Sequence, residues 1–170
     1  MKKMLLSVVA AAVLSTGMAH AADGVEKKIN LVATINDAIY VSKPDGKSWY
    51  TTEELYAKDY TQTEFASNVL PVRIFSKAEK VDVSLVQAVV IHKDDGAEFQ
   101  NVVVNFAGKT LPASGSANTI TQTTVANGGF DNIYDLQILA DAPTMVGGAS
   151  ADANNGQYQG DLVMLFEPKP

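Results

Sequence analysis

The fold is decided by an alternating stretch in the middle of the chain, Val81-Asp82-Val83-Ser84-Leu85. Every second residue is apolar, and alternate side chains of a β-strand point to opposite faces, so this period of two predicts a strand with one buried face. The apolar series continues through Val89 and Ile91, and Asp94-Asp95-Gly96 follows as a turn. The next alternating stretch covers residues 102–106, and we therefore expect a hairpin over residues 80–106.

Three further stretches alternate in the same way and predict three more strands. Asn127-Gly128-Gly129 is a turn signal that introduces the second of them, and Pro168 and Pro170 end the third. Several short strands separated by turn signals predict an all-β fold, a sandwich of antiparallel sheets. The apolar residues of these strands are Leu70, Val72 and Ile74, then Tyr134, Leu136, Ile138 and Ala140, and last Leu162, Met164 and Phe166.

Two segments do not alternate. Residues 43–66 read as a long connection rich in aromatic side chains, with one helical turn expected at residues 52–56. Residues 142–157 are rich in Gly, Ala, Asn and Asp, a composition that predicts a mobile surface loop.

The start of the chain has the pattern of a secretory signal. Lys2 and Lys3 are followed by an apolar stretch at residues 5–14 and by the small-residue site Ala19-His20-Ala21. We therefore expect residues 1–21 to be removed, leaving an exported protein that begins at Ala22. Its remaining length suits one domain.

Composition excludes nucleic acid as a partner and points to a disulfide-free protein. The formal net charge is −6, and Arg73 is the only arginine, whereas phosphate binding needs a basic patch. Cysteine is absent although export leads to a compartment where disulfides form. Stability must come from core packing or from contacts with other chains.

Residues 25–36 form an alternating segment at the start of the exported chain. Its odd positions are mostly apolar and its even positions mostly polar, which is typical of a strand with one apolar face. Two interpretations follow: an ordinary first strand of the sandwich, or a strand that adds to the sheet of another molecule. The apolar positions are Val25, Ile29, Leu31, Ala33 and Ile35.

The chain resembles major pilins of the colonisation-factor-antigen-I type, which belong to the alternate chaperone–usher class. The resemblance covers most of the exported chain and is most specific at its two ends. The matching pieces are residues 25–35, Lys43-Pro44-Asp45-Gly46, Phe65, Val72-Arg73-Ile74, Leu136-Gln137-Ile138, Ala142-Pro143 and residues 156–164.

That resemblance implies an immunoglobulin-like sandwich, residues 37–170, which lacks its last strand and is completed by donor-strand complementation. Residues 22–36 would be the donor strand of the next subunit, with Val25, Ile29, Leu31, Ala33 and Ile35 facing the groove, and Leu162, Met164 and Phe166 would line the acceptor groove. The implied partners are identical pilin subunits, a periplasmic chaperone, an outer-membrane usher and a tip adhesin. The implied location is a surface fimbrium that supports adhesion to host surfaces.

Catalytic chemistry is weakly represented. His92 is the only histidine beyond the signal and reads as a solvated turn residue, and Arg73 reads as an outward strand residue in an ion pair. We expect no enzyme activity, no metal and no cofactor. One alternative is a monomeric secreted or periplasmic sandwich that binds a ligand, such as a carbohydrate, through residues 43–66. A third hypothesis is a small hydrolase that uses Asp94 or Asp135.

Overall fold

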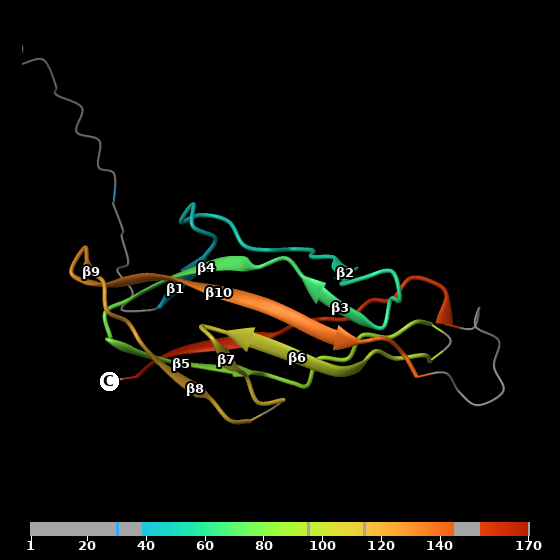
Figure 1. Cartoon of the computed structure of the whole chain (residues 1–170). Helices are drawn as coiled ribbons and strands as arrows, with labels where there is room; N and C mark the ends of the chain where they lie inside the picture. Colours follow the sequence, from blue (N-terminus) through green and yellow to red (C-terminus); the bar gives the residue numbers. More distant parts are fainter. Residues whose placement is uncertain (1–29, 31–38, 95, 114, 145–153, 170) are drawn as a thin grey trace, which may run out of the picture. The chain divides into compact units, whose positions relative to one another are not determined.

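The computed structural model of the protein describes residues 30, 39–94, 96–113, 115–144 and 154–169. The chain divides into two units, Met1–Thr34 and Ile35–Pro170, and the fold below is that of the second. Its regular structure is almost wholly β (Figure 1). Within the described ranges, no helix is long and apolar enough to cross a membrane.

The larger sheet is built around β10, Gly129–Asp141, which is its longest strand. β10 pairs antiparallel with β4, Leu70–Ser76, through its first half, and with β6, Gln100–Phe106, through its second half. The shorter strands of this sheet are β1 (Tyr40–Ser42), β2 (Leu55–Ala57), β3 (Glu64–Ser67), β7 (Lys109–Thr110) and β9 (Val125–Ala126).

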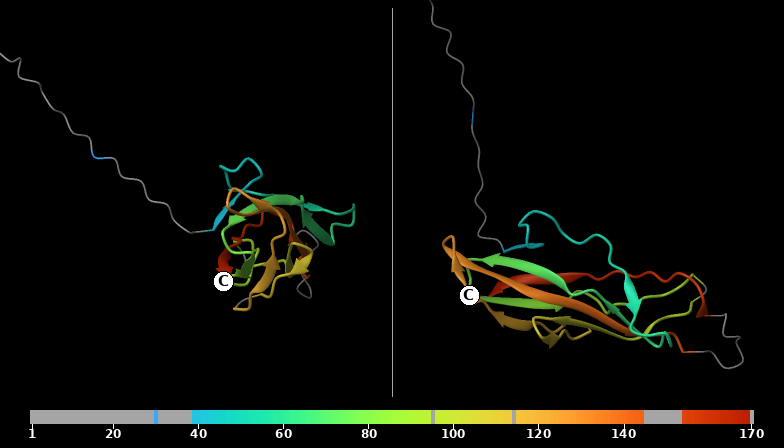
Figure 2. Two further views of the ribbon diagram at one scale, coloured as in Figure 1. Left: turned by 90° about the vertical axis from the view of Figure 1, so that its left-hand side faces the viewer. Right: turned by 45° about the horizontal axis from the view of Figure 1, so that its top comes forward.

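The smaller sheet has the order β11-β5-β8. β5, Lys80–Leu85, lies in the middle, with β8, Asn118–Thr121, on one side and β11, Met164–Lys169, on the other. Both pairings are antiparallel. The two sheets face each other as the layers of a sandwich (Figures 1 and 2).

The core lies between the sheets and follows the period of two. β4 and β5 each bury every second side chain. Val72 and Ile74 of β4, and Val81 and Val83 of β5, have no exposed surface, and Phe106 of β6 packs among them. The alternation in the sequence thus marks the two inner faces.

Most of the predicted strands are confirmed, and the turn before β10 is confirmed in detail. Asn127 and Gly128 have positive φ angles of 52° and 76°, as a tight two-residue hairpin turn requires, and Ala126 pairs with Gly129 across it. By contrast, the last strand does not end before Pro168, because β11 runs through this residue to Lys169.

Two other predictions are wrong. The expected helical turn at residues 52–56 is absent, and strand β2 begins at Leu55 instead. The expected hairpin over residues 80–106 exists only at its tip, where Lys93 and Ala97 are bonded and His92 pairs with Glu98. β5 ends at Leu85, and β6 lies in the opposite sheet. The chain crosses from one sheet to the other between Leu85 and Gln100, where the apolar residues no longer alternate on a single face of a strand.

Candidate functional site

Among the described strands, β11 and β8 form the two edges of the smaller sheet, and the inner side chains are incompletely covered along β11. β11 pairs with β5 along its whole length, from Met164 opposite Leu85 to Lys169 opposite Lys80. No other strand in the described part of the chain pairs with β11. An open edge of this kind carries backbone N–H and C=O groups that another strand can bind.

The register shows which residues carry those groups. The N–H of Val86 donates to the C=O of Val163 at 3.0 Å, just before β11 begins. Because antiparallel pairs alternate between bonded and non-bonded, residues 163, 165, 167 and 169 direct their backbone groups toward β5. Met164 and Phe166 therefore direct their N–H and C=O groups to the open edge.

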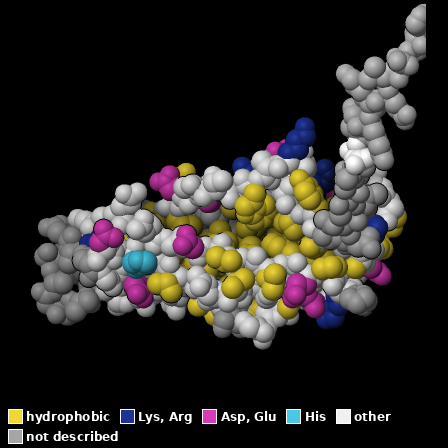
Figure 3. Space-filling model, turned by 180° about the vertical axis from the view of Figure 1, so that it is seen from behind, with side chains coloured by type: hydrophobic (Ala, Val, Ile, Leu, Met, Phe, Trp, Pro, Cys, Tyr) yellow, Lys and Arg dark blue, Asp and Glu magenta, His cyan; other side chains and the backbone are white. Residues whose placement is uncertain are grey.

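The inner side chains along this edge are less covered than their neighbours. On β5, Val81 and Val83 are 0% exposed and Leu85 is 4% exposed. Leu162, Met164 and Phe166 face the same core, yet all three are only half-buried. Phe166 reaches inward to the ring of Phe106, with 5.7 Å between ring centroids. Figure 3 shows a hollow lined by hydrophobic side chains across one face of the domain.

The larger sheet also ends in an edge strand, β1, which pairs only with β4 among the described strands. Its Val41 and the neighbouring Ile39 are half-buried and pack against the core. Tyr50 covers the core next to them: its hydroxyl donates to the C=O of Pro71 at 3.0 Å, and Lys43 lies 4.5 Å from its ring centre. Burial raises the pKa of Tyr50. Part of the aromatic segment therefore closes the sandwich.

The C-terminal end of β11 is fastened to the rest of its sheet. Lys169 Nζ lies 3.1 Å from Asp82 Oδ2 of β5 and 3.0 Å from Thr119 Oγ1 of β8. Two hydrogen bonds lower the pKa of Asp82, and the one from Thr119 has a larger effect than the one from Lys169. These contacts connect all three strands, so the open edge is firmly placed at this end.

The segment that leads into β11 is fastened at the other end of the domain. Gln159 and His92 exchange two backbone hydrogen bonds, of 2.9 and 3.0 Å. Phe65, Phe99 and Tyr158 stack edge to face, with centroids 4.9 and 5.0 Å apart. Both ends of this edge are thus anchored, while no described strand pairs with the outer side of β11 between them.

Comparison with known proteins identifies the family. The family model described as CS1 type fimbrial major subunit matches residues 25–167, most of the chain. The chain belongs to the CS1 type fimbrial major subunit family. It is therefore a major pilin, a structural subunit of a surface fimbrium, as the sequence predicted.

A solved structure agrees on the fold of this CS1 type pilin. This chain is similar to the solved CooA pilin subunit from enterotoxigenic Escherichia coli, with a TM-score of 0.61 and 24% sequence identity. The match covers 76% of this chain and 86% of the CooA chain. A search of the curated proteins gave no match. The predicted resemblance to colonisation-factor pilins and the predicted pilin sandwich are confirmed, and the monomeric ligand-binding alternative is not favoured.

The structure of the CS1 type pilin brings only part of the predicted site together. Leu162, Met164 and Phe166 lie in a row along the open edge, although Leu162 precedes β11. The predicted donor residues Val25, Ile29, Leu31, Ala33 and Ile35 lie outside the described residues, as do the predicted signal, residues 1–21, and most of the predicted loop, residues 145–153. Sequence reasoning missed β1, since a three-residue strand carries no periodic signal.

The only arginine of this pilin is a strand residue in an ion pair, as expected. Arg73 Nε donates to Asp131 Oδ1 at 2.8 Å, and Arg73 Nη2 also contacts Asp131 Oδ2. The guanidinium lowers the pKa of Asp131, a side chain that is only 10% exposed. The pair joins β4 to β10 and fixes the large sheet rather than a ligand.

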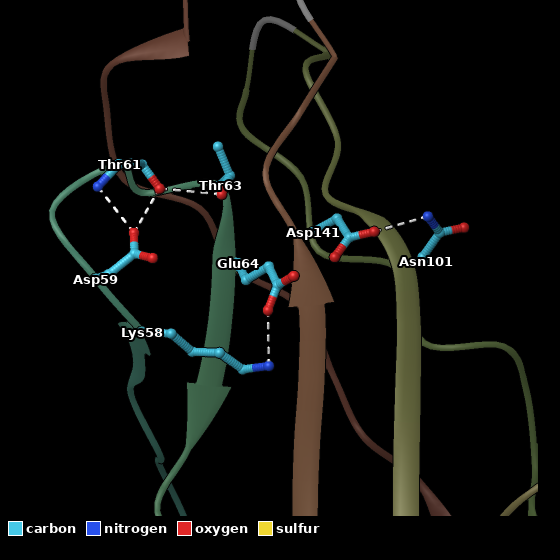
Figure 4. Close-up of polar contacts among 7 residues, drawn as sticks. All are labelled: Lys58, Asp59, Thr61, Thr63, Glu64, Asn101 and Asp141. Atoms are coloured by element: carbon cyan, nitrogen blue, oxygen red, sulfur yellow. Dashed lines mark hydrogen bonds and ion pairs between the residues drawn. The ribbon is translucent and has the colours of Figure 1, made fainter.

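Polar side chains at the turn between β2 and β3 pair with one another (Figure 4). Lys58 pairs with Glu64 at 2.9 Å, and the backbone N–H of Thr61 donates to Asp59 Oδ1 at 2.9 Å. Beside this turn, Asn101 of β6 donates to Asp141 of β10 at 2.8 Å. Bonds from Thr61 lower the pKa of Asp59. His92 and Asp94 are exposed at their turn, and Asp135 is exposed on β10. Among the described residues, no three His, Cys, Asp or Glu side chains gather as metal ligands would.

Proposed function

We propose that this pilin polymerises by donor-strand exchange: residues 22–36 of one subunit add as a strand to the open edge of β11 in the next. The resulting fibre is displayed on the cell surface and supports adhesion to host surfaces. The proposal makes residues 37–170 the pilin domain and residues 1–21 a signal that directs export through the periplasm.

The open edge of β11 is the observation that carries the proposal. Met164 and Phe166 offer backbone N–H and C=O groups on that edge, and their side chains leave the core beneath it incompletely covered. A strand that binds there would gain main-chain hydrogen bonds and would bury apolar side chains in the same step.

The proposed donor suits that edge chemically. In residues 22–36, Ile29, Leu31, Ala33 and Ile35 share one face, with Val25 at the start of the same series. Moving a Leu or Ile from water into a fitted apolar pocket contributes about 1.5–3 kcal/mol. Several such side chains together with the backbone ladder would join two subunits without a disulfide, which a chain without cysteine cannot form.

The joint is head-to-tail. Each subunit would donate residues 22–36 and accept a strand at β11, so the two contact surfaces differ. A heterologous contact of this kind propagates into a filament when its rotation does not close. The partners are therefore identical subunits, with a tip adhesin at the end of the filament.

The same edge explains why helper proteins are needed. A subunit with an unpaired strand edge and an uncovered core is prone to aggregate. We infer that a periplasmic chaperone lends a strand to β11 until the outer-membrane usher brings the next donor strand. Nothing in this scheme uses catalysis or a cofactor.

A pair of neighbouring substitutions in the donor segment tests the proposal. Leu31→Asp places a charge on the apolar face, while Thr34→Asp places the same charge on the opposite face. In cells that express the whole fimbrial system, we expect electron microscopy to show no filaments for L31D and normal filaments for T34D. Normal filaments from L31D would contradict donor-strand exchange through residues 22–36.

A further inference from the structure

Pro168 occupies a particular position on the open edge. It lies opposite Val81 in the pairing of β11 with β5, and the pairing continues to Lys169. Counting two residues from Met164 to Phe166 and two more to Pro168 places its backbone on the open side. The ladder between β11 and β5 can therefore continue past Pro168, because it does not use the backbone N–H of this position.

The backbone hydrogen-bonding groups on the open edge therefore differ from one end of β11 to the other. Met164 and Phe166 each present one donor and one acceptor, whereas Pro168 presents a C=O group and no N–H. An added strand that reached Pro168 would leave one of its own carbonyl groups without a backbone partner. Proline on edge strands is a known means of limiting pairing with further strands.

The change is not caused by fraying of β11. Lys169, the residue after Pro168, contacts both Asp82 and Thr119 and pairs with Lys80. β11 therefore stays in its sheet beyond Pro168, and the edge there is geometrically available to another strand. What is missing at this position is one backbone donor.

We infer that Pro168 ends the donor-strand ladder and thereby fixes its register. This inference rests on the proposed function. The incoming strand bonds to both backbone groups of Met164 and of Phe166, and the C=O of Pro168 is the last acceptor. If the donor strand were displaced by two residues toward Lys169, one of its residues would lose a β11 partner that offers both N–H and C=O. It would gain in exchange a partner that offers C=O alone. The loss disfavours that register by about tenfold.

Restoring the missing donor tests the inference in the assembled fibre. Pro168→Ala adds an N–H to the open edge, while Glu167→Ala is the matched control, since the N–H of residue 167 points to β5. Residue-resolved hydrogen–deuterium exchange on purified polymers should show the new amide of P168A protected. The polymer should dissociate in denaturant about 2- to 10-fold more slowly than wild type, and E167A should dissociate like wild type.

The outcomes separate the two proposals. If the amide at residue 168 exchanges freely while those of Met164 and Phe166 are protected, Pro168 does not end the ladder and donor-strand addition stands. If Met164 and Phe166 themselves exchange freely in the polymer, strand addition at β11 fails, and this inference fails with it. Pro168→Val repeats the test with a strand-favouring residue. Loss of polymer in both proline variants but not in E167A would overturn the inference, because an added donor is expected to strengthen the joint.

Discussion

β5 and β11 are neighbouring strands of one sheet with the same alternation, yet their inner faces differ. The inner side chains of β5 are almost wholly buried, and those of β11 are half-buried. β5 has a strand on each side, whereas β11 has one only on the β5 side among the described residues. An alternating pattern therefore tells which face of a strand turns inward, and the neighbouring strands decide how well that face is covered.

The largest expected effect contrasts two residues that face each other across these strands. Leu85 of β5 is opposite Met164 of β11. Leu85→Ala should lower the free energy of unfolding by about 2–5 kcal/mol, because it leaves a cavity in a closed core. Met164→Ala should cost roughly half of that or less, since its side chain is partly solvated already. Urea denaturation of the purified full-length protein measures both free energies of unfolding. Equal losses of stability for the two variants would show that the inner face of β11 is covered as well as that of β5.

The next effect concerns the joint between subunits. Met164→Ala removes apolar surface that the proposed donor strand would bury, so polymers should dissociate about fivefold faster, equivalent to about 1 kcal/mol. Leu165→Ala is the control, because Leu165 points outward and is 44% exposed. The measurement is the rate at which polymer ladders convert to monomer in mild denaturant. Equal rates for the two variants would show that the inner face of β11 is not part of the joint.

The smallest effect concerns the end of β11 and depends on pH. The pKa of Asp82 is lowered from its ordinary value of 3.8. A lowered carboxyl pKa stabilises the folded state above that ordinary value, and the contribution disappears as the pH falls through the lowered pKa. Asp82→Asn should therefore destabilise the subunit slightly at about pH 5, and the difference from wild type should shrink at lower pH. A difference that grows on acidification would rule out this contact as a support of β11.

The long strands could be predicted from the sequence because their inner residues alternate over five residues or more, as in β4 and β10. β8 could not, because its buried series passes from Ile120 to Gln122, a polar side chain that is 1% exposed. Gln122 Nε2 donates to the C=O of Ala78 at 3.3 Å, so a tertiary contact replaces the apolar signal. Strands of two to four residues, such as β1, β2 and β9, are too short to show a period.

The sequence also could not tell which of the two sheets each strand joins. Asp94 and Gly96 predict a turn, which the structure confirms, yet a turn signal does not tell whether β5 and β6 pair or lie in opposite sheets. For the site, alternation identified Met164 and Phe166 as inward-facing. Their free backbone groups became evident only from the register set at Val163 and Val86, because register is a property of two strands together.

The position of β11 in chain order has a consequence for biosynthesis. β11 is the last strand of the described chain, and β5, its partner, is made some eighty residues earlier, as Met164 opposite Leu85 illustrates. A polypeptide that ended before Met164 would leave β5 as an edge strand and would remove the cover that β11 gives to the core beside Val81 and Val83. Such a chain would expose an unpaired strand edge, and an edge of this kind favours aggregation.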